Sequence, residues 1–173
     1  MVLWVSALKK PGKTEEISMS TNFKVAVVTA RFNSEVTFKL EEGALSELKK
    51  LGCQNVKSVR VPGAFEIPLA AKWFFDTGYD AVVALGCVIR GETSHYDYVC
   101  SAVERGCTEL QLRTGKPVAF GVLTTENDEQ AMDRAGGKHG NKGAEAAQVA
   151  VEMLHLKLQL DLPLGLPFDV GAR

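Results

Sequence analysis

The sequence predicts an α/β protein, a three-layer αβα sandwich of flavodoxin-like type around a four-stranded parallel sheet. Short apolar runs rich in β-branched residues recur along the chain, and each is followed by a longer stretch with apolar residues at helical spacing. Strands that are apolar along their whole length are typical of a sheet covered on both faces. Alternation with helices makes the connections right-handed crossovers between parallel strands.

Four apolar runs are expected to be strands. They span residues 23–30 (FKVAVVTA), 56–61, 81–89 (AVVALGCVI) and 117–123. The run over 81–89 is the most apolar, so we expect it near the centre of the sheet.

Four amphipathic stretches are expected to be helices, because their apolar residues recur every three or four positions. They span residues 35–51, 66–77, 95–114 and 141–160. Gly52 and Gly78 follow the first two of these stretches, as glycines commonly follow the last turn of a helix.

The 173 residues, 46% apolar and 24% charged, fit one globular domain. We expect an N-terminal arm over 1–21, the α/β domain over 22–160 and an irregular C-terminal tail over 161–173. The net charge of -1 does not suggest a nucleic acid or an anionic membrane as partner. No apolar run approaches the ~20 residues of a membrane span.

The cysteines suggest no metal site, because they form no CxxC pair and do not cluster with the histidines. They are expected to be buried, reduced thiols of a cytoplasmic protein: Cys53, Cys87, Cys100 and Cys107. The apolar start of the chain is followed by Lys9 and Lys10, which is the wrong order for a secretory signal.

Ligands of open α/β sheets bind beyond the carboxyl ends of the strands. After the four expected strands the chain places polar residues and glycines, in the segments 31–33, 62–66, 90–95 and 124–127. Because these segments converge on one edge of the sheet, the sequence predicts a binding site there.

The segment Gly91–His95 (GETSH) leads from a strand into a helix, where unpaired backbone N–H groups favour an anion. An ordinary helix start, with Ser94 as the cap and Asp97 as a capping-box-like acid, explains the spacing equally well. His95 falls in the first turn, where the helix dipole favours a neutral, proton-accepting imidazole. His139 and His155 have no comparable setting and are expected on the surface.

The segment 134–143 (RAGGKHGNKG) is rich in glycine and cations and opens the last helix. Cations beside a flexible turn suit a phosphate or carboxylate, although a solvated loop has the same composition. Phe32 follows the first strand, where it either stacks on a planar ligand or belongs to the core.

Five stretches together resemble lumazine synthase: VVTARFN, VPGAFEIP, GCVIRGETSHYDYV, FGVLTTEN and RAGGKHGNKGAEAA. They occur in the order of that family and cover roughly residues 23–158. The family condenses 5-amino-6-ribitylaminouracil with 3,4-dihydroxy-2-butanone 4-phosphate to 6,7-dimethyl-8-ribityllumazine. The resemblance therefore implies a transferase of riboflavin biosynthesis that needs no metal and no cofactor.

The resemblance also implies roles for individual residues, some of them reaching the site from a neighbouring subunit. His95 would shuttle protons, and the phosphate would bind main-chain N–H groups of Glu92 and Thr93 together with the cation of Arg134. The family often has a small residue in place of Glu92, so its acid should contribute through the backbone alone. The substrate pocket would be completed by Phe32, which stacks on the pyrimidine, and by Asn33, Gly63, Ala64, Glu66, Val88, Ile89, Phe120 and Lys142.

The family assembles into pentamers, and some members close into shells of sixty subunits. The short turn over 137–142 resembles shell-forming members, whereas many pentamer-only members carry an insertion there. The absence of proline over 13–30 also leaves the arm able to add a strand to a neighbour's sheet.

Three alternatives stay open at this stage. They are an archaeal-type riboflavin synthase with the same fold, a flavin-binding module without catalysis, and a mainly structural shell protein. The stretches RGETSHYDYV and RAGGKHGNKG favour lumazine synthase. A passive flavin binder would not need a proton shuttle such as His95.

Overall fold

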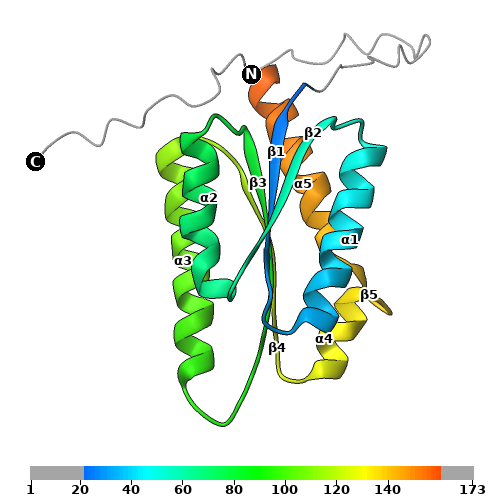
Figure 1. Ribbon diagram of the computed structural model, residues 1–173, viewed down its shortest axis with the longest axis vertical. Coiled ribbons are helices and arrows are strands. Elements are labelled where there is room, and N and C mark those ends of the chain that lie inside the picture. The colour runs from blue at the N-terminus through cyan, green and yellow to red at the C-terminus, as the bar shows by residue number, and fades with distance from the viewer. Residues whose placement is uncertain (1–21, 161–173) are drawn as a thin grey trace, which may run out of the picture.

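The computed structural model describes residues 22–160 (Figure 1). Its sheet has the order β2-β1-β3-β4, and every pairing in it is parallel. The strands are β1 (Lys24–Ala30), β2 (Asn55–Val61), β3 (Ala81–Ile89) and β4 (Val118–Thr125). The predicted fold class is confirmed, with the most apolar strand inside the sheet. The expected arm and tail lie outside the described residues.

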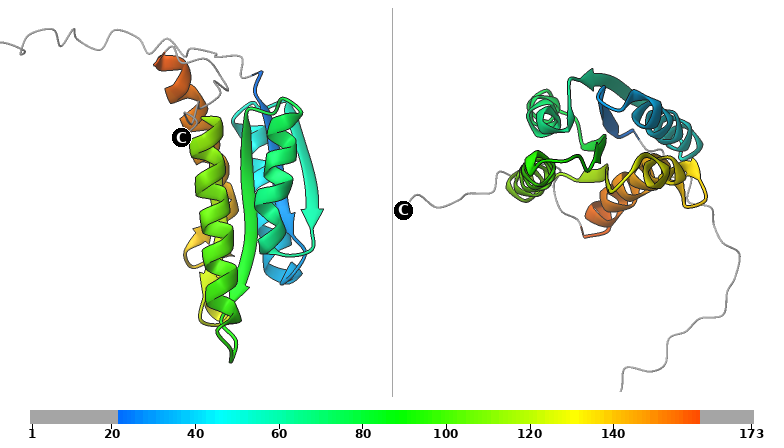
Figure 2. Two further views of the ribbon diagram at one scale, coloured as in Figure 1. Left: turned by 90° about the vertical axis from the view of Figure 1, so that its left-hand side faces the viewer. Right: turned by 90° about the horizontal axis from the view of Figure 1, so that it is seen from below.

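Helices cover both faces of the sheet (Figures 1 and 2). One face carries α2 (Ile67–Asp76), preceded by the 3-10 turn η1 (Ala64–Glu66), and α3 (His95–Thr114). The other face carries α1 (Ser34–Lys50), the short α4 (Asp128–Arg134) and α5 (Lys142–Gln159). Within residues 22–160 no helix is both long enough and apolar enough to cross a membrane.

The core consists of two layers, one on each side of the sheet, because successive strand residues point to opposite faces. On β1, Val25 and Val27 pack toward α1 and α5, whereas Ala26 and Val28 pack toward α2 and α3. All four side chains are fully buried. This accounts for the continuous apolar runs that predicted the strands.

The connection between β4 and α5 differs from the expectation of an open loop. β4 continues through Thr124 and Thr125, α4 follows, and β5 (Ala135–Gly137) pairs antiparallel with β6 (Gly140–Asn141). A helix of seven residues is too short to reveal a period in the sequence. Its cap was the available signal, since the Asn127 side chain accepts a hydrogen bond from the Gln130 N–H at 2.9 Å.

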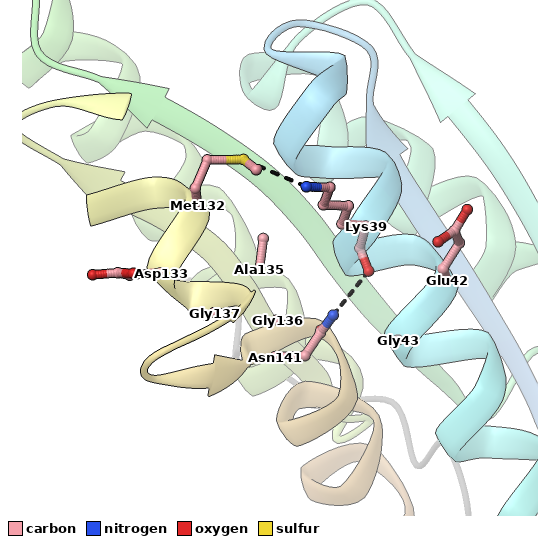
Figure 3. Close-up of a pocket in the computed structure, with 9 residues that line it drawn as sticks. All are labelled: Lys39, Glu42, Gly43, Met132, Asp133, Ala135, Gly136, Gly137 and Asn141. Atoms are coloured by element: carbon pink, nitrogen blue, oxygen red, sulfur yellow. Dashed lines mark hydrogen bonds between the residues drawn. The ribbon is translucent and has the colours of Figure 1, made fainter. Parts of the chain in front are cut away.

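The start of α5 packs directly on α1 at what we call the α1–α5 joint, formed by Leu40, Gly43, Asn141 and Gly143. Figure 3 shows two of these residues, Gly43 and Asn141. The Asn141 side chain accepts hydrogen bonds from the N–H groups of Gly143 and Ala144 and donates one to the Lys39 carbonyl at 2.9 Å. A Cβ atom added at Gly143 would overlap the Leu40 carbonyl. The joint therefore requires glycine where the two helices touch.

Candidate active site

A cavity of about 570 Å³ opens at the carboxyl edge of the sheet, on the face covered by α2 and α3. We call it the histidine pocket. It brings together most of the predicted site residues, drawn from three stretches of the chain. Its lining comprises Phe32, Gly63, Ala64, Phe65, Glu66, Cys87, Val88, Ile89, Gly91, Thr93, His95, Tyr96 and Val99.

Phe32 and Asn33 form the turn after β1, but the structure uses them differently. The Phe32 ring is 71% exposed, which leaves it able to stack on a planar ligand. Asn33 has a left-handed backbone with φ 57°, and its side chain donates a hydrogen bond to the Cys87 carbonyl at 2.9 Å. Asn33 therefore ties the turn to β3 and stands beside the pocket lining, not in it.

The wall opposite this turn is formed by η1 and the end of β3. One Glu66 carboxylate oxygen accepts a hydrogen bond from the Gly63 N–H at 2.9 Å, which fixes the carboxylate at the pocket. Ala64 is buried beneath it, and Val88 and Ile89 are half-buried in the last part of β3. Backbone and carboxylate groups thus face the same cavity as the Phe32 ring.

The segment Gly91–Ser94, which we call the His95 loop, is exposed throughout. His95 is the first residue of α3, and its N–H donates to the Thr93 hydroxyl at 3.4 Å. Ser94 occupies the cap position, but its side chain makes no capping hydrogen bond. The structure therefore contradicts the capping hydrogen bond expected of the Ser94 side chain. Glu92 is exposed and lies outside the pocket lining.

The remaining predicted residues, Phe120, Arg134 and Lys142, lie in a second cavity of about 390 Å³ between β4 and the helices α4 and α5. We call it the cation pocket. The Lys142 ammonium contacts both carboxylate oxygens of Glu145, at 2.7 and 2.8 Å. Arg134 donates to the Gln130 carbonyl at 3.0 Å, and Phe120 is 44% exposed. Within one chain the predicted site is therefore divided between two pockets.

Sequence reasoning missed one residue in the lining of each pocket. Tyr96 lines the histidine pocket, and Glu145 lines the cation pocket. Burial raises the pKa of the Tyr96 hydroxyl. Tyr96 follows His95 directly, which was a usable signal. Glu145 lies one helical turn after Lys142, at the spacing of an ion pair.

A third cavity, of about 670 Å³, lies at the α1–α5 joint between α1 and the β5–β6 ribbon (Figure 3). It contains none of the predicted site residues. Beside it, the Lys39 ammonium approaches the Met132 sulfur at 3.9 Å. Asn141 lines this cavity, donates to the Lys39 carbonyl of α1 and directly precedes Lys142 of the cation pocket.

The other two histidines are in different settings. His139 is exposed as expected. The expectation for His155 was wrong, because this residue is half-buried and its ring centre lies 5.5 Å from that of Phe23. The apolar face of α5 brings it against the start of the sheet.

These features define a flavodoxin-like α/β protein with a candidate site in two pockets. One pocket has an exposed aromatic ring and a histidine at a helix start, and the other has cationic side chains. The sequence model of the family described as 6,7-dimethyl-8-ribityllumazine synthase matches residues 22–158. A protein of Bdellovibrio bacteriovorus named 6,7-dimethyl-8-ribityllumazine synthase is 60% identical over 139 residues, covering 79% of this chain and 76% of that protein.

The chain belongs to the lumazine synthase family, the transferases of riboflavin biosynthesis. The resemblance seen in the sequence is confirmed, and the comparison favours this family over the archaeal-type riboflavin synthases. The matched residues include both pockets, so the family assignment covers the whole candidate site.

Proposed function

We propose that this protein condenses 5-amino-6-ribitylaminouracil with 3,4-dihydroxy-2-butanone 4-phosphate, releasing 6,7-dimethyl-8-ribityllumazine, phosphate and water. The observation that carries the proposal is the histidine pocket, where Phe32, Glu66 and His95 line one cavity at the carboxyl edge of the sheet. An aromatic face suits the pyrimidine, a carboxylate suits the ribityl hydroxyls, and an imidazole suits proton transfer near neutral pH.

The proposed chemistry needs orientation and proton transfer more than it needs a strong electrophile. The amine of the pyrimidine substrate attacks the ketone and one water leaves to give an imine, with His95 moving the proton. Phosphate then leaves, and the ring closes on the remaining carbonyl with loss of a second water. The N–H groups of Glu92 and Thr93 receive the phosphate, because helix starts favour anions. Asn33, Gly63, Ala64, Val88 and Ile89 shape the pyrimidine site.

We further propose that a complete site needs two subunits. The histidine pocket lies on the α2 and α3 face of the sheet, and the cation pocket lies on the α5 face. In one subunit Arg134 is therefore available to the histidine pocket of a neighbour. There it would pair with the substrate phosphate, while Phe120 and Lys142 complete the pocket.

Exposed apolar side chains support such an assembly. One set lies on η1, α2 and α3 and comprises Phe65, Leu69, Trp73 and Tyr98. The other set lies on β4 and α5 and comprises Phe120, Val149, Met153 and Leu156. Two unlike surfaces that meet head to tail produce a closed ring when the rotations from each subunit to the next add up to a full turn. We propose a ring of five subunits, which can assemble further into a shell of sixty.

Two variants test the shared site. His95→Ala damages one pocket and Arg134→Ala damages the other, so each homo-oligomer should be weakly active. If subunits are dissociated, mixed in equal amounts and reassembled, about one quarter of the interfaces should combine an intact His95 with an intact Arg134. Recovery of about a quarter of the wild-type activity is expected. Activity that stays at the sum of the two parents would contradict a shared site.

The activity itself is tested by absorbance, with both substrates and with the lumazine product alone. Formation of lumazine only when both substrates are present is expected. Consumption of lumazine in the absence of the other substrates would indicate a riboflavin synthase reaction instead. Native mass spectrometry on the same sample distinguishes a ring of five from a shell of sixty, and a monomer would contradict both.

We also propose that this protein is located in the cytoplasm. Cys87, Cys100 and Cys107 carry free thiols, as is usual in a reducing compartment.

A further inference from the structure

Arg90 follows β3 and begins the connection to α3. Its backbone N–H donates to the Thr125 carbonyl at 2.9 Å, so its main chain is fixed to the end of β4. Its side chain bridges two carboxylates. The Nε atom lies 2.9 Å from Glu126, and Nη1 lies 3.3 Å from Asp97. Arg90 therefore connects the first turn of α3 to the segment that leads into α4.

The same guanidinium lies 4.0 Å from the ring centre of Tyr96, the residue that follows His95. The Tyr96 hydroxyl is hydrogen-bonded to Cys100 and to Thr124 of β4. Tyr96 is thus held from both sides, by Arg90 at its ring and by Thr124 at its hydroxyl. Since His95 is its direct neighbour, this clamp restricts the position of His95.

These contacts matter because the His95 loop has few others. Residues 91–95 are all exposed. The Thr93 hydroxyl accepts a hydrogen bond from the His95 N–H, two residues further along the chain. An exposed ion pair contributes little to folding, because water screens the two charges. The side chains of Arg90, Asp97 and Glu126 are 40%, 60% and 59% exposed. A large contribution to global stability is therefore not expected from this bridge.

We propose that Arg90 is a positioning residue for the reaction, a role that rests on the proposed function. By bridging Asp97 and Glu126 and covering Tyr96, it holds the His95 loop so that the Thr93 N–H and the His95 imidazole face the substrate phosphate. Arg90 itself does not bind the phosphate, because its charge is already shared between two carboxylates.

Two substitutions separate this role from direct phosphate binding. Arg90→Gln removes the bridge. Glu126→Gln removes one of its two anchors and leaves the guanidinium in place. Both should raise the inhibition constant of inorganic phosphate and the KM for the butanone phosphate. A displacement of about 1 Å in a reacting group can cost up to about 10²-fold, so we expect about tenfold for Arg90→Gln and about threefold for Glu126→Gln.

The sign of the Glu126→Gln effect decides between the two roles. If Arg90 were a phosphate ligand, removal of the competing carboxylate would tighten phosphate binding, and that result would overturn the proposal. The KM for the ribityl substrate should change by less than about twofold in both variants, because Phe32 and Glu66 are untouched. In the double variant the effect should not exceed that of Arg90→Gln alone, since both changes break the same bridge.

Arg113→Gln is the matched control. It breaks an exposed pair with Glu109 at the far end of α3 and should leave the phosphate constants unchanged. Thermal unfolding and native mass show whether each variant keeps its fold and assembly, and Glu126→Gln decides the question if Arg90→Gln does not fold. Wild-type protein that makes no lumazine would defeat the proposed function. Active wild type with unaffected Arg90 and Glu126 variants would defeat this inference alone.

Discussion

The histidine pocket and the cation pocket are held in shape by different kinds of contact. The cation pocket rests on the α1–α5 joint, where the backbones of Gly143 and Leu40 meet with no room for a Cβ atom. The histidine pocket ends in the exposed His95 loop, which is restrained by long side chains such as that of Arg90. Damage to the joint should therefore appear as a loss of folding, and damage to the loop as a loss of catalysis.

The difference follows from what each region presents to a ligand. In the cation pocket the side chains Arg134 and Lys142 supply charge, and a rigid base keeps them at the subunit surface. In the proposed function the backbone N–H groups of the His95 loop bind the phosphate, and such a loop must stay free of close packing. Side-chain tethers can restrain such a loop without covering its N–H groups.

The largest effect is expected for Gly143→Ala. Its Cβ would overlap the Leu40 carbonyl, so α5 must move away from α1, and overpacking of this kind typically costs about 1–3 kcal/mol and occasionally more. Gly91→Ala is the control from the His95 loop, because a Cβ there meets nothing within 4 Å. Denaturant unfolding should show a loss for the first variant and little change for the second. Equal stabilities would remove the contrast between the two regions.

His95→Ala tests the other side of the comparison. Loss of an acid–base group should lower turnover by roughly 10²-fold, while the exposed side chain leaves the unfolding temperature nearly unchanged. His139→Ala provides the control, since His139 is also exposed and lines neither pocket. Full activity in His95→Ala would exclude it from the mechanism.

The sequence predicted the parts of this molecule that repeat a simple pattern. β1 and β3 were visible because residues such as Val27 and Val83 are buried on a sheet that is covered on both faces. Convergence at the carboxyl edge correctly grouped Phe32, Glu66 and His95 in one pocket. The resemblance implied that some site residues come from a neighbouring subunit, but neither it nor the spacing predicted that Arg134 lies outside that pocket.

Other features depended on tertiary contacts that no local pattern reveals. α4 is too short to show a period, and the joint depends on the meeting of Leu40 with Gly143, which are far apart in the chain. The bridge from Arg90 to Glu126 also joins two separate connections. Charge alone gave no reason to pair these two residues in preference to other surface charges.

Arg134→Ala should affect one substrate more than the other. A charge-assisted hydrogen bond contributes about 1.5–3 kcal/mol, so the KM for the butanone phosphate should rise about tenfold or more. The KM for the ribityl substrate should change much less, because the histidine pocket keeps its lining. Steady-state kinetics with each substrate varied in turn measure the split. Equal changes in both constants would show that Arg134 is not the phosphate ligand.

A smaller effect is expected at Asn33, where side chain and backbone can be tested separately. Asn33→Ala removes the hydrogen bond to Cys87 and places alanine at φ 57°, and we expect a loss of about 1–2 kcal/mol. Asn33→Gly removes the same bond but tolerates the backbone, so its loss should be smaller. Equal destabilisation of both variants would show that the left-handed backbone at this position does not penalise alanine relative to glycine.

A last comparison concerns two of the buried thiols, one on each face of the sheet. Burial raises the pKa of Cys87, in the core beneath α1, to about 12, with a contribution from Asp128. Burial also raises the pKa of Cys107, between α2 and α3, to about 12, with a contribution from Glu104. The ordinary value for the unfolded chain is 9.0.

Because the folded-state pKa lies above the unfolded value, the stabilisation from each protonated thiol is fully present below pH 9.0 and is lost as the pH rises toward about 12. Denaturant unfolding at increasing alkaline pH should show this decline in the wild type. Cys87→Ala and Cys107→Ala should each make the decline shallower by a similar amount, since the two pKa values are alike. A decline that is unchanged in Cys107→Ala but reduced in Cys87→Ala would mean that the α2 and α3 face admits water to its core before the α1 and α5 face does.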